Sequence, residues 1–483
     1  MDGFDAVVVG SGPNGLVGAV RLAEAGRRVL VLEAASRWGG GLRTEELTLP
    51  GFRHDVCSSV HPLARASPAF RYLGLEREGL RWADPAIPLA HPLEEASVDA
   101  VLLERSVAAT AAGLGVDERR WQQWFQPLAD HAGPVVDTIL DPFHVPSSSE
   151  WPALSRFGLT GLRSASSLAR SLKGERARAL LAGNAAHSIL DLAQPLSGGF
   201  GLLMALLAQS HGWPVAVGGS QSIADALVER LRALGGEIAL DAPVTNIDAL
   251  PASSTVLLDL TPRQLLKIAG HRLPPRYANA CGRYRYGPGV FKVDWALDGP
   301  VPWRNPIVGD AGTVHLGGSF AEIETSERAV QRGRHPEQPF VLFVQATAAD
   351  PTRAPAGKHT GWAYCHVPSG STVDMTDAIE GQLERSAPGF RDRVLARHTM
   401  GPAALEAHNS NNVGGDIGGG VTDFRQLIGR PILSTKPWRT PLPGVFLCSS
   451  STPPGGGVHG MGGWHAARLA TTRSQRQQAR FFV

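Results

Sequence analysis

The sequence has few of the residues that build covalent or metal-bound scaffolds. Its 483 residues include only four cysteines, which lie far apart: Cys57, Cys281, Cys365 and Cys448. None of them forms a CxxC pair, which excludes a disulfide scaffold, a zinc ribbon, a c-type haem site and a dithiol redox centre. We therefore expect no metal site and a reducing, cytoplasmic compartment.

Long hydrophobic runs and charge of one sign are also lacking. No apolar run approaches the roughly 18 residues that a membrane-spanning helix needs, and a strand pattern from Asp5 onward predicts no signal peptide. Because 46 Lys and Arg oppose 44 Asp and Glu, a nucleic-acid-binding surface is not indicated. With 43% hydrophobic and 19% charged residues, the composition excludes a disordered or collagen-like chain and predicts a soluble globular protein.

Glycine is plentiful, with 56 residues, and its first cluster follows a predicted strand. Residues 6–9 form a short apolar run, typical of a buried parallel strand. A helical pattern occupies residues 16–25, and a second strand is predicted at 29–32. The loop between the first strand and the helix reads Gly10-Ser11-Gly12-Pro13-Asn14-Gly15.

This loop has the spacing of a dinucleotide-binding turn. Gly10 permits the tight strand-to-helix turn, Gly12 lets a pyrophosphate approach the backbone, and Gly15 allows close helix packing. The N–H groups at the helix start favour the phosphate charge. Glu33, at the end of the second strand, can accept a hydrogen bond from a ribose hydroxyl and would repel a 2′-phosphate, which argues against NADP. The alternative is a glycine-rich turn without a ligand.

Two further glycine clusters favour FAD over NAD. Gly39-Gly40-Gly41 and Arg43 lie where a cofactor that runs deeper into the protein could pass. Near the C-terminus, a predicted strand at 444–448, a glycine loop at 454–463 and a helix from Trp464 predict a second anion-stabilising site. In a flavoenzyme such a site would support the electron-rich edge of the reduced isoalloxazine ring.

Both ends of the chain resemble the phytoene desaturase-related FAD-dependent oxidoreductases, within the superfamily of amine oxidases and glutathione reductase-type FAD folds. The segments that carry this resemblance are residues 39–44, 50–55, 61–62 and 451–461. A finer resemblance, to the PYROXD2-like branch, is carried by residues 212–214, 412–417 and 430–431.

The resemblance implies FAD bound in extended form. The adenine half would lie on the first loop, which includes Pro13 and Asn14, and on Glu33, with Val244 as the strand residue whose backbone contacts adenine. The pyrophosphate or ribityl path would be lined by Gly40, Gly41 and Arg43, and the phosphate and flavin end by Ser450, Gly457, Val458 and Met461. Many relatives carry an acidic residue where this chain has Ser449-Ser450-Ser451, and hydroxyls there can still bond the ribityl chain.

Catalytic candidates are fewer, because hydride transfer to flavin N5 needs mainly positioning, and an acid or base is optional. His61 and His459 lie in the FAD motifs and could face the ring, although a lone histidine is more often a structural residue. Asp416 and Arg430 lie outside the FAD domain and could line a substrate cavity. The alternative for this pair is a loop-anchoring ion pair or cap.

We expect an α/β fold, in which a doubly wound βαβ FAD-binding domain is interleaved with a mixed α+β substrate domain. The FAD-binding domain is predicted from residues 1–75, 205–275 and 435–483. The substrate domain is predicted from a helical insertion, residues 76–204, and a strand-rich insertion, residues 276–434.

The expected function is an FAD-dependent oxidoreductase, a dehydrogenase, desaturase or oxidase, that moves a hydride from a fairly apolar small molecule to flavin N5. Oxygen, a quinone or another carrier would reoxidise the flavin. Three alternatives remain: an amine oxidase-like reaction at C–N, an FAD-dependent isomerase, and a non-catalytic prenyl-escort-like binder. The tail, residues 473–483, is either a peripheral membrane contact or a frayed end.

Overall fold

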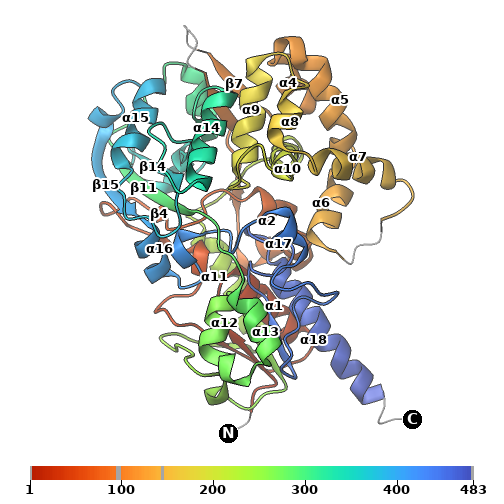
Figure 1. Ribbon diagram of the computed structural model, residues 1–483. Coiled ribbons are helices and arrows are strands. Elements are labelled where there is room, and N and C mark those ends of the chain that lie inside the picture. Colours follow the sequence, from red (N-terminus) through yellow and green to blue (C-terminus); the bar gives the residue numbers. More distant parts are fainter. Residues whose placement is uncertain (1–2, 94–98, 143–145, 480–483) are drawn as a thin grey trace.

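The structure, a computed structural model, describes residues 3–93, 99–142 and 146–479. Two sheets organise the molecule. In Figure 1 a parallel sheet and its helices form the lower part, a larger mixed sheet lies at upper left, and a group of helices lies at upper right. Strands from distant parts of the chain meet in each sheet, so the two layers are interleaved in sequence.

The parallel sheet has five strands in the order β16-β10-β1-β2-β9. Each neighbouring pair runs parallel. The strands are β1 (Ala6–Val9), β2 (Val29–Leu32), β9 (Glu237–Ala239), β10 (Thr255–Leu258) and β16 (Val445–Leu447).

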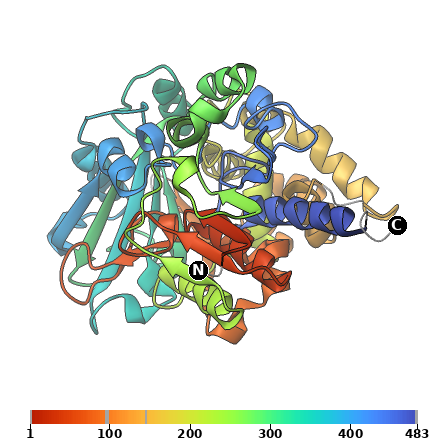
Figure 2. The ribbon, with the colours of Figure 1, turned by 90° about the horizontal axis from the view of Figure 1, so that it is seen from below.

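Helices cover both faces of this sheet, which explains why β1 reads as a continuous apolar run. Ala6 and Val8 pack into a core formed with α1 (Pro13–Glu24), α11 (Gln221–Ala233) and α18 (Met461–Ala479). Val7 and Val9 pack on the other face, against α12 (Pro262–Ala269) and α13 (Pro275–Gly282). Figure 2 shows the red strands between yellow-green α11 and green α12 and α13.

The two ends of the chain meet where α18 packs on α1. A Cβ atom on Gly463 would lie 1.7 Å from the carbonyl oxygen of Asn14, so only glycine permits this approach. The N–H of Gly462 donates to Asn14 Oδ1 at 3.1 Å. Glycine at the start of α18 is therefore needed for helix packing.

The second sheet has seven strands in the order β15-β11-β14-β13-β12-β6-β7. The β12–β6 pair is parallel, and the other pairs are antiparallel. The strands are β6 (Ile87–Pro92), β7 (Ala100–Leu103), β11 (Gly289–Leu297), β12 (Ala311–Leu316), β13 (Val341–Val344), β14 (His359–Val367) and β15 (Val394–Met400).

Alternate residues of the second sheet face different layers. Val341 and Phe343 pack with α15 (Thr376–Ser386), whereas Leu342 and Tyr364 face the helical side and α9. That helical side contains α4 (Val107–Ala112), α5 (Glu118–Ala129), α6 (Ala132–Leu140), α7 (Trp151–Gly161), α8 (Ala165–Ala169), α9 (Glu175–Ala186) and α10 (Ser197–Ser210).

Short elements complete the chain between the layers. The helices are α2 (Pro62–Ala66), α3 (Pro68–Leu73), α14 (Phe320–Gln331), α16 (Pro402–His408) and α17 (Phe424–Ile428). Two small antiparallel pairs join β3 (Thr44–Glu45) to β4 (His54–Asp55) and β5 (Trp82–Ala83) to β8 (Val215–Ala216).

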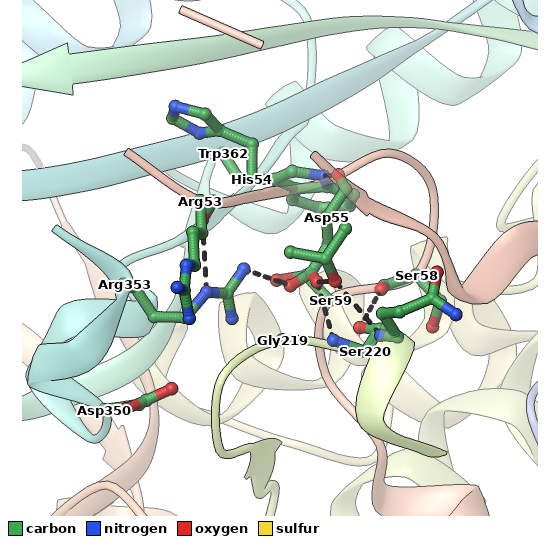
Figure 3. Close-up of polar contacts among 12 residues, drawn as sticks. Arg53, His54, Asp55, Ser58, Ser59, Gly219, Ser220, Asp350, Arg353 and Trp362 are labelled. Atoms are coloured by element: carbon green, nitrogen blue, oxygen red, sulfur yellow. Dashed lines mark hydrogen bonds and ion pairs between the residues drawn. The ribbon is translucent and has the colours of Figure 1, made fainter. Parts of the chain in front are cut away.

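A buried ion pair ties the two layers together. Arg353 Nη2 lies 2.8 Å from Asp55 Oδ2, and Trp362 of β14 donates to the Asp55 carbonyl (Figure 3). The carboxylate also accepts hydrogen bonds from the Ser59 hydroxyl and the Ser220 N–H. Burial acts to raise the pKa of Asp55, but the Arg353 charge and these hydrogen bonds outweigh it, so the net shift is downward.

The predicted fold class is confirmed: a doubly wound parallel sheet adjoins a mixed α+β layer. The first insertion supplies β6 and β7 to the second sheet in addition to its helices. The domain boundaries themselves stay a prediction. No helix among the described residues is both long enough and apolar enough to cross a bilayer. The tail at residues 473–483, expected as a peripheral membrane contact or a frayed end, has no described side chains.

Candidate functional site

A cavity of about 730 Å³ lies between the two sheets. Its wall runs from the first glycine loop to Leu342, Trp362 and Tyr364 on the second sheet. Fourteen predicted site residues line it: Gly10, Gly12, Pro13, Asn14, Glu33, Gly40, Gly41, Arg43, His61, Val244, Asp416, Ser450, Gly457 and Val458. Gly15, Arg430, His459 and Met461 are not part of this wall. The individual roles stay predictions.

The first glycine loop forms a cradle that side chains would fill. A Cβ atom on Gly15 would lie 2.2 Å from the Gly10 carbonyl oxygen, and one on Gly40 would lie 3.0 Å from Gly12 Cα. The N-cap residue of α1, Gly12, supplies no side-chain cap, and the first turn contains no acidic residue. The Asn14 N–H has no partner among the described residues, so the helix start keeps a donor for an anionic ligand, as a dinucleotide site requires.

Glu33 is held at the end of β2 by its neighbours. Its Oε2 accepts hydrogen bonds from the Ser11 N–H at 2.9 Å and the Ser11 hydroxyl, and its Oε1 accepts from Ala35 N–H at 3.0 Å. Arg43 Nη2 lies 3.4 Å from Oε1. The carboxylate is thus fixed in orientation while it still lines the cavity, where a ribose hydroxyl could reach it.

Val244 lies in the loop after β9, because that strand ends at Ala239. The expectation of a strand residue at this position was wrong. Beyond β9, Asp241 and Ala242 still bond to the chain after β2, but Val244 itself lies outside any strand, and an apolar side chain alone does not specify one. Val244 nevertheless lines the cavity.

Of the three serine hydroxyls after β16, two bind backbone carbonyls and one is left for the cavity. Ser449 donates to the Leu260 carbonyl and Ser451 donates to the Gly419 carbonyl. The Ser450 hydroxyl has no hydrogen-bond partner among the described residues, and Ser450 lines the cavity. This is the one hydroxyl of the three that a bound cofactor could use.

Two backbone donors at the start of α18 are already bound within the protein. The Met461 N–H donates to His459 Nδ1 at 3.1 Å, and the Gly462 N–H donates to Asn14 Oδ1. These two donors are therefore not available to a ligand. Gly457 and Val458 do line the cavity, and Gly457 has a φ of 118°.

His61 has a defined tautomer. The Ser220 hydroxyl donates its proton to the Ser58 carbonyl at 2.5 Å, so it must accept from His61 Nε2, which lies 2.8 Å away. His61 Nδ1 is then an unprotonated nitrogen, and it has no hydrogen-bond partner. Burial lowers the pKa of His61 to about 4, so the ring is neutral near pH 7.

The geometry favours structural roles for His459 and Arg430. His459 lies against its own loop, with Nε2 3.2 Å from the Gly455 carbonyl oxygen, and burial lowers its pKa to about 4. The fully buried Arg430 guanidinium donates to the carbonyls of Ser450 and Gly418 at 2.8 Å each, and also contacts those of Val421 and Gly420.

Asp416 both lines the cavity and caps its own loop. Oδ2 accepts from the Gly287 N–H at 2.8 Å, and Oδ1 accepts from the Gly418 N–H at 2.7 Å. Burial raises the pKa of Asp416 despite these bonds. The alternative for this pair was a loop-anchoring ion pair or cap. The described residues show no ion pair between Asp416 and Arg430, and both side chains bind backbone groups of their loops.

Two further residues of the wall were not predicted. Asp259 follows β10, and its carboxylate accepts a hydrogen bond from the Gly15 N–H at 2.9 Å. His187 follows α9, with Nε2 3.0 Å from His315 Nε2, and its Nδ1 has no partner among the described residues. A lone acid in an apolar strand was a usable signal for Asp259, whereas His187 fell inside a predicted helix and gave none.

The deep end of the cavity forms a chamber of neutral side chains. Burial lowers the pKa of His187 to about 3, so this residue is uncharged near pH 7. Its ring meets Trp213 edge to face, with centroids 5.4 Å apart. We define the chamber by nine residues of the wall, which come from α10, from the loops after α9 and α10, and from strands of the second sheet: His187, Ser188, Ile189, Phe200, Met204, Trp213, Leu342, Trp362 and Tyr364.

The chain is similar in sequence to several known proteins. Residues 8–73 match the model of an NAD(P)-binding Rossmann-like domain. The chain is 24% identical to pyridine nucleotide-disulfide oxidoreductase domain-containing protein 2 of Rattus norvegicus, over 96% of this chain and 93% of that protein. It is 26% identical to a phytoene dehydrogenase of Streptomyces griseus, over 81% of this chain and 77% of that protein.

Among solved structures, putrescine oxidase bound to putrescine shares the fold, with a TM-score of 0.60 and 17% identity over 99% of each chain. The glycine cradle, the oriented carboxylate of Glu33 and the unpartnered Ser450 hydroxyl fit FAD, which is the cofactor of this group. The chain is similar to phytoene desaturase-related FAD-dependent oxidoreductases, and these similarities identify it as an FAD-type oxidoreductase, an enzyme.

Proposed function

We propose that the protein removes two hydrogens from a fairly apolar small molecule that binds in the chamber. The observation that carries this proposal is the continuity of the cavity, which extends from the dinucleotide loop to the chamber. Among the described residues of the wall, only Glu33, Arg43, Asp259 and Asp416 carry acidic or guanidinium groups, and none of them belongs to the chamber. An apolar molecule can therefore be buried next to the cofactor at little desolvation cost.

Some residues of this chain would bind FAD and the substrate, and others would orient the substrate. The glycine cradle, Glu33 and Ser450 would hold FAD, which when bound accepts the two electrons of a dehydrogenation. Ile189, Phe200, Met204 and Leu342 would bind and dehydrate the apolar body of the substrate. His187 Nδ1 could hold one polar group of the substrate by a single hydrogen bond, as could the His61 Nδ1 lone pair after a small shift.

The test is anaerobic bleaching of the flavin absorbance by candidate substrates. The panel contains amines, alcohols, polyenes and other lipid-like compounds of matched size. We expect bleaching by an alcohol, a polyene or a related apolar compound, and reoxidation by oxygen or a quinone on mixing. Bleaching by charged, strongly polar compounds alone would contradict an apolar substrate.

Oxidation of amines at C–N is the second candidate, supported by two aromatic rings in the wall. Trp362 and Tyr364 both line the cavity, with ring centroids 5.4 Å apart. Their planes meet at 87°, so the pair does not form two facing walls for a flat or extended amine. Release of peroxide with polyamines or aromatic amines would favour this reaction. A product of unchanged mass under anaerobic conditions would instead indicate an isomerase.

A further inference from the structure

Asp259 lies against the glycine loop that would hold the pyrophosphate. Its Oδ2 is 2.9 Å from the Gly15 backbone nitrogen. A Cβ atom on Gly12 would lie 2.6 Å from the same oxygen, and one on Gly10 would lie 3.2 Å from Asp259 Cβ. The side chain is buried and lines the cavity. A carboxyl group therefore shares the start of α1 with any ligand that binds there.

Few backbone donors remain at this helix start. Helix α1 begins with Pro13, which has no N–H, and the Gly15 N–H is taken by Asp259. The Asn14 N–H has no partner among the described residues. If the pyrophosphate of FAD binds at Asn14, two anionic groups lie side by side at one helix terminus, out of bulk water. Two like charges that lie side by side away from bulk water cannot both remain ionised without a large cost in free energy.

None of the described groups that act on Asp259 is a cation. Glu33, directly after β2, is acidic and repels it, and Arg43 is paired with Glu33. Cys448, directly after β16, is a neutral thiol, because burial and Asp259 raise its pKa. Gln264 of α12 is uncharged, and the Asn411 amide donates to the Asp259 backbone carbonyl and not to the carboxylate.

The pKa of the Asp259 carboxyl is already shifted from its usual value before any ligand binds. Burial, with a smaller contribution from Glu33, raises the pKa of Asp259 to about 7, although the Gly15 N–H acts in the opposite direction. The carboxylate is therefore partly protonated near neutral pH, and a neighbouring anion would push the pKa higher still.

We propose that Asp259 takes up one proton when FAD binds, so that a neutral carboxyl accompanies the pyrophosphate at the start of α1. In this arrangement the Gly15 N–H still donates to Asp259, and the pyrophosphate becomes the only full anion at the helix start. The inference rests on FAD as the cofactor and is independent of which substrate is oxidised.

Proton uptake makes FAD affinity depend on pH in a defined direction. Above about pH 7 the free protein has lost the proton that the complex needs, so the Kd for FAD rises about tenfold for each pH unit. Well below about pH 7 the carboxyl is already protonated, and the Kd becomes independent of pH. FAD should thus be held most tightly in mildly acidic solution.

The experiment dilutes the purified holoenzyme at a series of pH values between about 6 and 9 and measures released FAD by its fluorescence. Far-UV circular dichroism confirms that the chain stays folded. The test variant is Asp259→Asn, whose amide oxygen can still accept from Gly15. The matched control is Asp416→Asn, which removes another buried carboxylate of the same cavity wall.

We expect a tenfold rise in Kd per pH unit above about pH 7 for the wild type and the Asp416→Asn control, and a flat profile for Asp259→Asn. A pH-independent wild type would overturn the proposal, as would an unchanged slope in Asp259→Asn. If that variant does not fold, Asp259→Ser replaces it.

As an independent check, a dye in weakly buffered solution should report one proton released per FAD during dilution. A chain that holds no FAD at any pH would contradict the cofactor assignment instead.

Discussion

Two loops of this protein follow the same plan, and the structure uses them differently. Each joins a buried parallel strand to a helix through a run of glycines: β1 to α1 at residues 10–15, and β16 to α18 at residues 454–463. At α1 the helix start lines the cavity and is shared with Asp259. At α18 the first donors are bound to His459 and Asn14.

The difference shows that a glycine loop before a helix is not by itself an anion site. The N–H groups at a helix start bind a ligand only where the protein has not already supplied acceptors. At α18 the glycines at 462 and 463 instead let one helix pack on another. Its loop contributes to the cavity through Gly457 and Val458, which precede the helix.

The largest effect is expected from Gly12→Val, which fills the α1 cradle. The new Cβ would lie 2.6 Å from Asp259 Oδ2, and overpacking of this kind costs about 1–3 kcal/mol, or up to about a hundredfold in affinity. The purified variant should be almost colourless. Gly457→Val should also lose flavin: the nearest neighbour of its new Cβ is the flexible end of Leu63, but its φ of 118° is a conformation that valine rarely adopts. Flavin content per protein, from the absorbance spectrum, measures both.

The control for these variants is Gly158→Val, at an exposed position of α7 with no atom within 4 Å of a new Cβ. It should keep its full complement of flavin. Normal flavin in both Gly12→Val and Gly457→Val would contradict the site and remove the contrast between the two loops.

A smaller effect is expected from His459→Ala, which tests whether the α18 start is structural. The change leaves the buried Met461 N–H without its acceptor, at a cost of about 1–3 kcal/mol. For a chain of 483 residues each kcal/mol lowers Tm by about 1 °C. The exposed His271→Ala serves as control and should leave Tm nearly unchanged.

The outcome separates a structural histidine from a catalytic one. A structural His459 lowers Tm, and the folded fraction keeps its flavin and its rate of flavin reduction per bound flavin. An unchanged Tm with loss of flavin reduction would instead place His459 in the chemistry, contrary to its contacts with Gly455 and Met461.

The smallest effect is expected from Ser450→Ala. Loss of one hydrogen bond to the cofactor is worth about 0.5–1.5 kcal/mol, so the Kd for FAD should rise about two- to tenfold. Ser451→Ala is the matched control, because the Ser451 hydroxyl is bound to the Gly419 carbonyl. FAD release on dilution measures both. An equal rise in the Kd for FAD in the two variants would contradict the assignment of Ser450, and not Ser451, to the cofactor.

Much of the dinucleotide half could be predicted because its signals are local. The apolar run at 6–9, the glycine spacing after it and Glu33 at the next strand end each report on neighbouring residues, and all lie where expected. The prediction failed at Val244, where a loop continues beyond β9. Asp259 and His187 were missed because their importance comes from contacts with distant residues.

The sequence by itself determined the parallel strand, the glycine turn and the helix at the N-terminus, since short-range sterics and burial periodicity specify these elements. Only the tertiary structure decided which helix start is open to a ligand. The acceptor for Gly462 is Asn14, 448 positions away in the sequence, and the acceptor for Gly15 is Asp259, 244 positions away. Contacts across such separations depend on how the layers pack, and no local pattern of residues records them.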